Sequence, residues 1–331
     1  MAERIIVKVG TSSLVAGGRV DPDRAAVLVE EVAGLVRAGL QPVLVASGAI
    51  ALGRAVGAEQ RQLAAALGQG PFFEALRTRL ADHELTAAQF LLTPVDLVDP
   101  RHHPGVRATL EHALDKGVIP VVNENDAVRV RNNDILAALL SALLRARMLV
   151  LLTDVPGLYD KDPRTAPDAR LIPEIKGMTV EVERLAGATG SGPGTGGMVS
   201  KLGAVWIATT AGASAAIVGA HQPGALPRLL RGESVGTIVH PRSTVPGYGL
   251  ERLWLAFGEP PAGTVVCLPG TRRLVAADEP VPREAVIRTA GRFTEGDVVD
   301  LAVPGGEVIA RGRIRRTAVP PSEYVSFLEA S

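Results

Sequence analysis

Over the first 240 residues, short apolar runs alternate with segments whose apolar positions repeat at helical spacing. The apolar runs are nearly continuous, which is typical of strands that a mostly parallel sheet buries on both faces. The strands predicted on this basis cover residues 4–9, 42–46, 118–122, 148–152 and 214–218, with a weaker candidate at 87–91. Because helices are expected between successive strands, the alternation predicts an α/β fold, a three-layer αβα sandwich around the sheet.

The best-defined helix is predicted over residues 22–37. Asp21 is suited to cap its N-terminus, Pro22 to occupy its first turn and Gly39 to follow its end. Two further helices are predicted over residues 104–116 and 198–211. The apolar run at 135–144 is shorter than the ~18–20 residues that crossing a bilayer requires, so it predicts a buried helix.

The pattern changes near residue 241, where proline and glycine become frequent. The short apolar runs that follow, separated by glycine and proline, are typical of a small β-barrel. These runs cover residues 264–268, 285–289, 298–303 and 308–314. We therefore expect three parts, which are a large domain over residues 1–240, a linker over 241–262 and a small barrel over 263–331.

Composition narrows the classes of function. Hydrophobic residues make up 47% of the 331-residue chain and charged residues 21%, as is usual for a globular protein with a buried core. The 35 basic residues balance the 35 acidic ones, so the chain as a whole has no basic excess to attract nucleic acid or an anionic membrane. A single cysteine, Cys267, excludes an internal disulfide, and the N-terminus shows no signal-peptide pattern. Both observations favour the cytoplasm.

Lysine and asparagine are distributed unevenly. Only five of the 35 basic residues are lysines, so a lysine is expected where a compact ammonium must approach a crowded phosphate. All four asparagines, Asn123, Asn125, Asn132 and Asn133, fall in one stretch that ends at Asp134. Carboxamides donate and accept hydrogen bonds without carrying charge, so this stretch predicts a polar pocket, with chance clustering as the alternative.

Candidate anion-binding groups follow two of the predicted strands. Lys8 lies near the end of the first strand, and Gly10 begins a turn whose N–H groups and neighbouring ammonium suit a phosphate. Ser47 and Gly48 follow the second strand, where a hydroxyl and a helix N-terminus suit a carboxylate. Ordinary strand-to-helix turns are the alternative in both places.

The asparagine-rich stretch offers the groups that an amino-acid substrate needs. Asp126 can pair with an ammonium, and Asn133 can donate to a carboxylate. Asp134, at the predicted start of a helix, is either part of this pocket or only an acid that the helix dipole stabilises.

Two later segments predict a nucleotide site. Thr153 and Asp154 follow a buried strand and precede a Pro-Gly turn. Residues 194–201 form a glycine-rich turn that leads into a helix carrying Lys201, although they have neither P-loop spacing nor a preceding Rossmann strand. A glycine-rich linker is the alternative. The six histidines have no spacing typical of metal ligands.

Together these segments resemble the amino acid kinase family, and within it the members that use ATP to phosphorylate the γ-carboxylate of L-glutamate in the first step of proline biosynthesis. The resemblance rests on residues 7–12, 47–50, 122–126, 152–159 and 194–201, which occur in the family's order. The tail resembles a PUA domain. The resemblance implies the amino acid kinase fold, ATP and L-glutamate as substrates, and Mg²⁺ that reaches the site with ATP.

The resemblance also implies roles by position. Lys8 and Lys201 match the two lysines that stabilise the transferred phosphoryl group, and Asp134 matches the aspartate that organises them. The glutamate-binding positions match Ser47, Asp126 and Asn133. The nucleotide-binding positions match Lys8, Thr153, Asp154, Thr195, Gly196, Gly197, Met198, Val199, Ser200 and Lys201. Further implications are a homo-oligomer, proline as a feedback inhibitor and a reductase that consumes the product.

The chain departs from the family pattern in two places. The family usually has Gly-Asp-Asn-Asp where this chain has Arg131-Asn132-Asn133-Asp134, and the PUA-like tail is short. The first difference bears on glutamate affinity and on inhibition by proline, because it removes a carboxylate and adds a guanidinium beside the pocket.

The sequence leaves two other functions open. One is a kinase of the same family that acts on acetylglutamate, aspartate, carbamate or a nucleoside monophosphate. The other, from a different class, is RNA binding through the PUA-like tail. Residues 263–331 contain nine arginines and nine acids, so the tail lacks the basic excess typical of such proteins.

Overall fold

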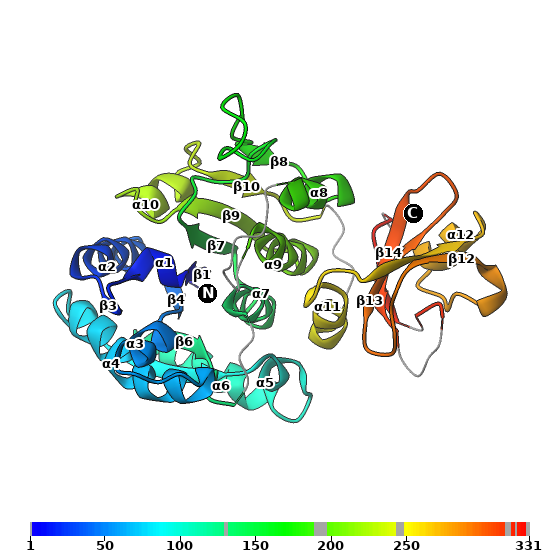
Figure 1. Ribbon diagram of the computed structural model, residues 1–331. Coiled ribbons are helices and arrows are strands. Elements are labelled where there is room, and N and C mark those ends of the chain that lie inside the picture. The colour runs from blue at the N-terminus through cyan, green and yellow to red at the C-terminus, as the bar shows by residue number, and fades with distance from the viewer. Residues whose placement is uncertain are drawn as a thin grey trace.

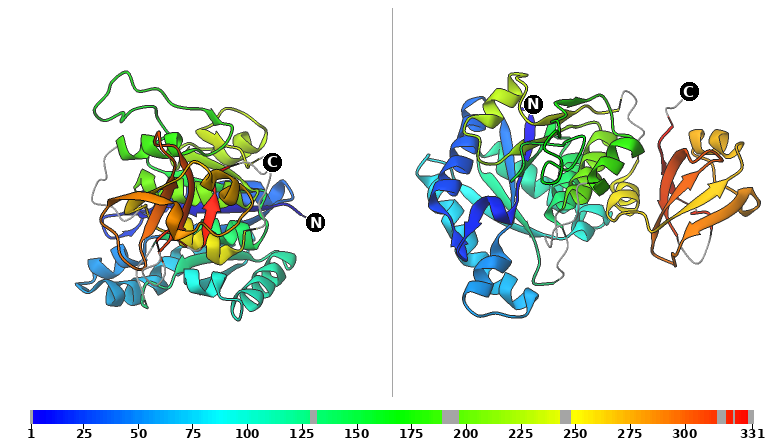
Figure 2. Two further views of the ribbon diagram at one scale, coloured as in Figure 1. Left: turned by 90° about the vertical axis from the view of Figure 1, so that its right-hand side faces the viewer. Right: turned by 45° about the horizontal axis from the view of Figure 1, so that its top comes forward.

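The computed structural model describes the chain except for residues 1, 129–131, 189–196, 243–247, 315–318, 322 and 329–331 (Figure 1). Its described part contains an eight-stranded sheet and a separate five-stranded sheet. Figure 2 shows the two sheet-containing units side by side, with the smaller one against one flank of the larger. None of the described helices has the length and apolar character that crossing a membrane requires.

The larger sheet has the strand order β5-β6-β4-β1-β7-β9-β10-β8. Its pairs are parallel except for β9 with β10, so the predicted mostly parallel sheet is confirmed. Its strands are β1 (Arg4–Val9), β4 (Gln41–Ala46), β5 (Ala87–Leu92), β6 (Ile119–Glu124), β7 (Met148–Thr153), β8 (Glu174–Ile175), β9 (Ser214–Gly219) and β10 (Thr237–Val239). The six predicted strands are all present, whereas β8 and β10 were not predicted because runs of two or three residues give no clear pattern.

Helices cover both faces of this sheet (Figure 1). Successive β1 residues alternate between two apolar cores, with Ile6 in one and Ile5 and Val7 in the other. The first core contains α5 (Pro94–Val98), α6 (His103–Asp115), α7 (Asn133–Leu143) and α9 (Met198–Thr210). The second contains α2 (Pro22–Arg37), α4 (Arg61–Ala81) and α10 (Ala225–Leu230). The αβα layering predicted from the sequence is therefore confirmed.

Helix ends follow the local sequence. The Asp21 carboxylate accepts hydrogen bonds from the N–H groups of Asp23 and Arg24, so it caps α2 as predicted. Buried helix α7 begins at Asn133, close to the predicted start. The short helix α1 (Thr11–Leu14) and the hairpin of β2 (Val15–Ala16) and β3 (Arg19–Val20) were not predicted.

Helix α3 (Ala49–Ala55) and α4 touch through their backbones. A Cβ atom on Gly53 would lie 1.9 Å from the Ala64 carbonyl oxygen, and one on Gly68 would lie 1.8 Å from that of Ala49. Glycine is therefore required at both positions. This contact fixes α3 directly after Ser47, and it brings the middle of α4 close to the ends of the sheet strands.

The smaller sheet has a core of its own and is consistent with the predicted PUA-like barrel. Its order is β12-β11-β13-β14-β15, with β11 and β13 parallel and the other pairs antiparallel. The strands are β11 (Gly263–Cys267), β12 (Val286–Gly291), β13 (Val298–Ala302), β14 (Val308–Arg313) and β15 (Tyr324–Ser326), accompanied by α12 (Thr271–Ala276) and the 3-10 helix Arg283–Ala285.

The segment between the sheets contains a helix, α11 (Leu250–Phe257), where the sequence analysis expected only a linker. Frequent proline and glycine on either side concealed its amphipathic pattern. Helix α11 packs against α9, and Phe257 stacks on Trp206 with a centroid distance of 5.3 Å. Phe327 stacks on Trp206 at 4.8 Å, and Arg242 donates to the Ser326, Phe327 and Leu328 carbonyl oxygens. Rings and carbonyl groups together therefore fasten the smaller unit to the larger one.

Candidate active site

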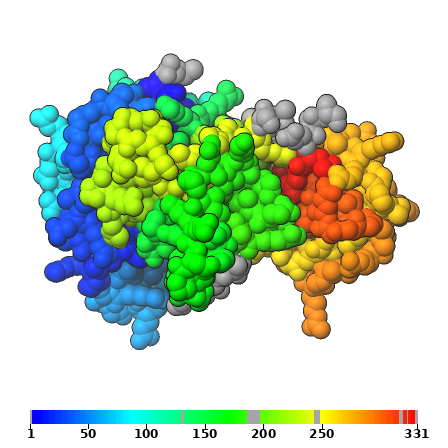
Figure 3. All heavy atoms as spheres, turned by 90° about the horizontal axis from the view of Figure 1, so that it is seen from above, coloured from blue at the N-terminus to red at the C-terminus, as the bar shows by residue number. Residues whose placement is uncertain are grey.

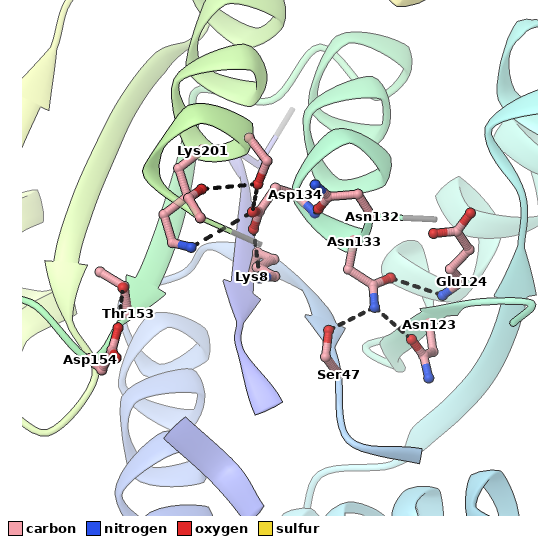
Figure 4. A network of polar contacts seen from close by, with 12 residues as sticks. Lys8, Ser47, Asn123, Glu124, Asn132, Asn133, Asp134, Thr153, Asp154 and Lys201 are labelled. Atoms are coloured by element: carbon pink, nitrogen blue, oxygen red, sulfur yellow. Dashed lines mark hydrogen bonds and ion pairs between the residues drawn. The ribbon is translucent and has the colours of Figure 1, made fainter. Parts of the chain in front are cut away.

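The candidate site lies where β1, β4, β6 and β7 end at one edge of the large sheet. Strand β1 lies between β4 and β7, and the helices that begin near this edge include α7 and α9. Open parallel sheets usually bind ligands beyond the carboxyl ends of such central strands. The first turn of α7 carries two adjacent side chains, Asn133 and Asp134, that take part in two different polar networks (Figure 4).

The first network joins the two predicted lysines through one carboxylate. Lys8 Nζ lies 2.6 Å from Asp134 Oδ1, and Lys201 Nζ lies 3.8 Å from Asp134 Oδ2. Lys8 comes from β1 on the same face as Ile6, whereas Lys201 comes from the first turn of α9. Lys8 is 5% exposed, Lys201 8% and Asp134 0%. Two ammonium groups therefore share one carboxylate at a site that is largely shielded from water.

Burial and charge act in opposite directions on these groups. Burial raises the pKa of Asp134, but the Lys8 and Lys201 ammonium groups outweigh it and hold this pKa below its usual value. Burial lowers the pKa of Lys201, and attraction to Asp134 only partly compensates for it. Two cations against one buried anion leave a positive excess, which suits a site for phosphate groups.

Ser200 helps to hold the Asp134 carboxylate. Its hydroxyl donates to Asp134 Oδ2 at 2.7 Å. Ser200 was predicted as a nucleotide contact, and the structure places it between the start of α9 and the start of α7. The two helices that supply Lys201 and Asp134 are therefore linked directly at their first turns.

The second network is a chain of carboxamides. Asn133 Nδ2 donates to Ser47 Oγ at 2.7 Å and to Asn123 Oδ1 at 2.8 Å, while Asn133 Oδ1 accepts from the Glu124 N–H at 2.9 Å. Asn123 Nδ2 in turn donates to Gln69 Oε1 on α4 at 2.7 Å. Both N–H bonds of the Asn133 carboxamide are thus used within the protein, so this side chain orients Ser47 and Asn123.

The remaining predicted glutamate-binding residue is Asp126, and Asn132 lies on the other side of the undescribed residues 129–131. Asp126 is half-buried just beyond β6, and its backbone N–H donates to the Glu124 carbonyl oxygen. Asn132 caps α7, because its Oδ1 accepts from the Asp134 N–H at 2.8 Å. Asparagine and aspartate cap helices about equally well, so Asn132 keeps the capping ability of the family's aspartate. Arg131 lies outside the described residues.

The predicted nucleotide segment is only partly described. Thr153 Oγ1 donates to Asp154 Oδ1 at 3.0 Å at the end of β7. Burial lowers the pKa of Lys201, and the Asp154 charge, like that of Asp134, acts against this lowering. Gly197 precedes α9, and Met198, Val199, Ser200 and Lys201 form its first turn. Thr195 and Gly196 lie outside the described residues. Among the residues that the structure describes, no group of three or more histidine, cysteine or acidic side chains is placed to hold a metal ion.

Gln69 belongs to the site although no pattern in the sequence predicts it there. Gln69 precedes Gly70 and Pro71, which interrupt the helical pattern there, so α4 itself was not predicted. Asn123 was predicted only to belong to the polar pocket of clustered asparagines, without a specific role. Only the fold brings Gln69 to Asn123.

The comparisons with known proteins agree with this arrangement. The profile of the amino acid kinase family matches residues 3–219. The glutamate 5-kinase of Bordetella petrii is 40% identical, with 100% of this chain and 93% of that protein covered. The glutamate 5-kinase of Trichlorobacter lovleyi is 37% identical, with 93% of this chain and 86% of that protein covered. The one of Pseudomonas syringae pv. tomato is 36% identical, with 98% of this chain and 91% of that protein covered.

Solved structures with the same fold are more distant in sequence. The carbamate kinase from Giardia lamblia bound to AMP-PNP has a TM-score of 0.55 and 18% identity, covering 73% of this chain and 99% of its own. The UMP kinase from Bacillus anthracis has a TM-score of 0.54 and 17% identity, with 73% and 97% covered. At these identities the likeness concerns the fold alone.

Proposed function

The chain belongs to the amino acid kinase family, in its glutamate 5-kinase branch, and on this premise we propose that it phosphorylates the γ-carboxylate of L-glutamate with ATP. The products are γ-glutamyl phosphate and ADP, and the reaction is the first step of proline biosynthesis. Mg²⁺ enters as the complex with ATP, since hard cations of this kind are commonly bound through substrate phosphates.

The reaction needs positioning and charge more than proton transfer. A glutamate side chain has an ordinary pKa of about 4.3, so its carboxylate is already ionised at neutral pH and needs no general base. One of its oxygens attacks the γ-phosphorus in line, a new P–O bond forms, and the bond to the ADP oxygen breaks. Negative charge on the transferred group and on ADP must then be stabilised by fixed cations.

The buried network of Lys8, Asp134 and Lys201 is the observation that carries this proposal. In our mechanism the two ammonium groups contact the transferred phosphoryl group and the phosphates of ADP, and Asp134 positions both. Ser47 and Asp126 bind the carboxylate and ammonium of glutamate, with Asn133 orienting Ser47. Thr153, Asp154 and residues 195–201 bind the nucleotide.

Hydroxylamine trapping tests the proposed reaction. The purified chain is incubated with ATP, Mg²⁺, L-glutamate and hydroxylamine, and hydroxamate and ADP are measured. Equal amounts of hydroxamate and ADP that depend on glutamate, and that are absent with aspartate or acetylglutamate, would identify an acyl phosphate on the proposed carboxylate. ATP binding without glutamate-dependent hydroxamate would refute the proposed substrate.

The other substrates considered for this family are less well supported. The relatives that align with nearly the whole chain are glutamate 5-kinases, whereas the carbamate kinase and UMP kinase share only the fold. RNA binding through the tail has no observation that favours it.

Several finer properties belong to the same proposal. We propose that residues 1–240 form the kinase domain and 263–331 a PUA-like domain, with α11 in the connection at 241–262. The supporting observation is that the large sheet ends at Val239 and the small one begins at Gly263. We also propose a cytoplasmic homo-oligomer that proline inhibits and whose labile product passes to a reductase. Light scattering measures the oligomer, and initial rates with proline test whether it competes with glutamate.

A further inference from the structure

A pocket of about 470 Å³, separate from the candidate active site, lies between the two sheet-containing units. One wall is formed by α8 (Val180–Ala188) and by Val199 at the start of α9, and the other by strands of the smaller sheet. Figure 3 shows the green spheres around α8 next to the orange spheres of the smaller unit. Its volume is within the range of pockets that bind small molecules.

The base of this pocket is formed by three charged side chains that are paired with one another. Arg311 on β14 is 2% exposed, and its Nε donates to Asp300 Oδ1 on β13 at 2.7 Å. Its two terminal nitrogens donate to the two carboxylate oxygens of Glu183 on α8, each at 2.7 Å. Because every Glu183 oxygen and every Arg311 nitrogen already has a partner, these residues do not select a ligand. Burial raises the pKa of Asp300 against the effect of Arg311. With every group charged, the two carboxylates and one guanidinium of the base carry one net negative charge, which the two other lining arginines, Arg184 and Arg288, outweigh.

Two arginines on opposite walls of the pocket have charges that a ligand can contact. Arg288, on β12, is exposed, and its side chain has neither an ion pair nor a hydrogen bond in the described part of the chain. Arg184, on α8, is exposed; it has a long ion pair of 3.8 Å to Glu181, and its charge also acts on the Asp300 carboxylate. The rest of the lining is largely apolar and includes Val180, Val199, Pro261, Val266, Ala302 and Val308.

We propose that this pocket binds a small molecule with an apolar body and one anionic group, either a carboxylate or a phosphate. The anionic group lies between Arg184 and Arg288, because a guanidinium matches both oxyanions with charge-assisted hydrogen bonds. The apolar body packs against the valines. The bound molecule contacts both units of the fold and the residue before Ser200. This site is distinct from the kinase reaction proposed above and does not depend on it.

Isothermal titration calorimetry on the full chain, saturated with Mg²⁺ and ADP to fill the nucleotide site, tests the proposal. The probes share an aromatic body and differ in the head group: phenylacetate, phenyl phosphate, benzyl alcohol and benzylamine. We expect the anionic probes to bind and the alcohol and amine to bind at least about tenfold more weakly, from the usual strength of hydrogen bonds between charged groups. Comparing phenylacetate with phenyl phosphate identifies the preferred oxyanion.

Substitutions locate the binding. Arg288→Gln and Arg184→Gln should each weaken the anionic probes by about tenfold or more, since each removes one charged donor. Arg283→Gln is the matched control, because Arg283 is an exposed arginine of the same unit that does not line the pocket. The proposal is overturned if the anions bind no better than benzyl alcohol, or if Arg288→Gln binds them as the unchanged chain does.

Discussion

Replacing Asp134 by asparagine would remove the negative charge that two buried ammonium groups share. The side chain keeps its size, and it keeps an oxygen that Ser200 can donate to. The change therefore tests charge with little change in shape. In the unchanged protein Asp134 lies 2.6 Å from Lys8 Nζ and 3.8 Å from Lys201 Nζ.

The size of the effect follows from these distances. At about 4 Å and an effective dielectric constant of ~20, opposite unit charges attract by about 4 kcal/mol, which corresponds to about three pH units. Asparagine keeps a dipole and water can enter, so we expect the pH at which Lys201 loses its proton to fall, but by less than this full amount. Turnover should fall ~10²–10³-fold, because both ammonium groups lose their fixed positions.

The assay is glutamate-dependent ADP release measured across pH for Asp134→Asn and for Asp115→Asn. Asp115 is an exposed carboxylate at the end of α6, so its substitution makes the same charge change away from the site. We expect the alkaline limb of the kcat profile to move to lower pH only in Asp134→Asn. A kcat within about threefold of the unchanged protein, with the alkaline limb unmoved, would refute the role given to Asp134.

Stability gives an independent measurement on the same variant. The pKa of Asp134 is lowered in the folded state, so its charge stabilises the fold fully above the unfolded pKa of about 3.9. This contribution is lost as pH falls through the lower folded value. Removing one partner of a buried pair usually costs about 3–5 kcal/mol. The difference in free energy of unfolding between the unchanged protein and Asp134→Asn should therefore be largest near neutral pH and should narrow below pH ~4.

Three other variants test separate parts of the structure. Lys8→Ala and Lys201→Ala should each lower kcat by ~10²–10³ with smaller changes in KM, and steady-state rates that stay near normal would exclude their role. Ser47→Ala should raise the KM for glutamate about tenfold and leave the KM for ATP within about twofold, as substrate titrations will show. Gly53→Ala should lower the free energy of unfolding by about 3 kcal/mol or more, because its Cβ would lie 1.9 Å from a carbonyl oxygen of α4; an unchanged urea midpoint would contradict this contact.

The sheet could be predicted because its strands are apolar on both sides. Residues 4–9 and 148–152 become β1 and β7 with little change in their limits, and the Asp21 cap fixes the start of α2. These features depend on residues close in sequence. The contact of Lys8, Asp134 and Lys201 is not local, because three elements far apart in the sequence bring these residues together. Their shared role could therefore be predicted only through a family resemblance.

The carboxamide network could not be predicted in this way. Its members come from the residue after β4, from α4, from β6 and from α7, and neither Gln69 nor Asn123 has a local pattern that indicates its partner. Helix α11 was missed for a different reason. Its eight residues lie among prolines and glycines that predict a connection, and only packing against α9 shows why they are helical.

The stack of Trp206, Phe257 and Phe327 has a consequence for synthesis on the ribosome. Trp206 emerges with the larger unit, whereas Phe327 emerges only after nearly all of the smaller one has been made. Val325 in β15 likewise belongs to the core that contains α7 and α9. Because domains usually fold in the order of translation, the larger unit waits with an uncovered aromatic surface. A chain stalled within the smaller sheet would present that surface to chaperones and to neighbouring nascent chains.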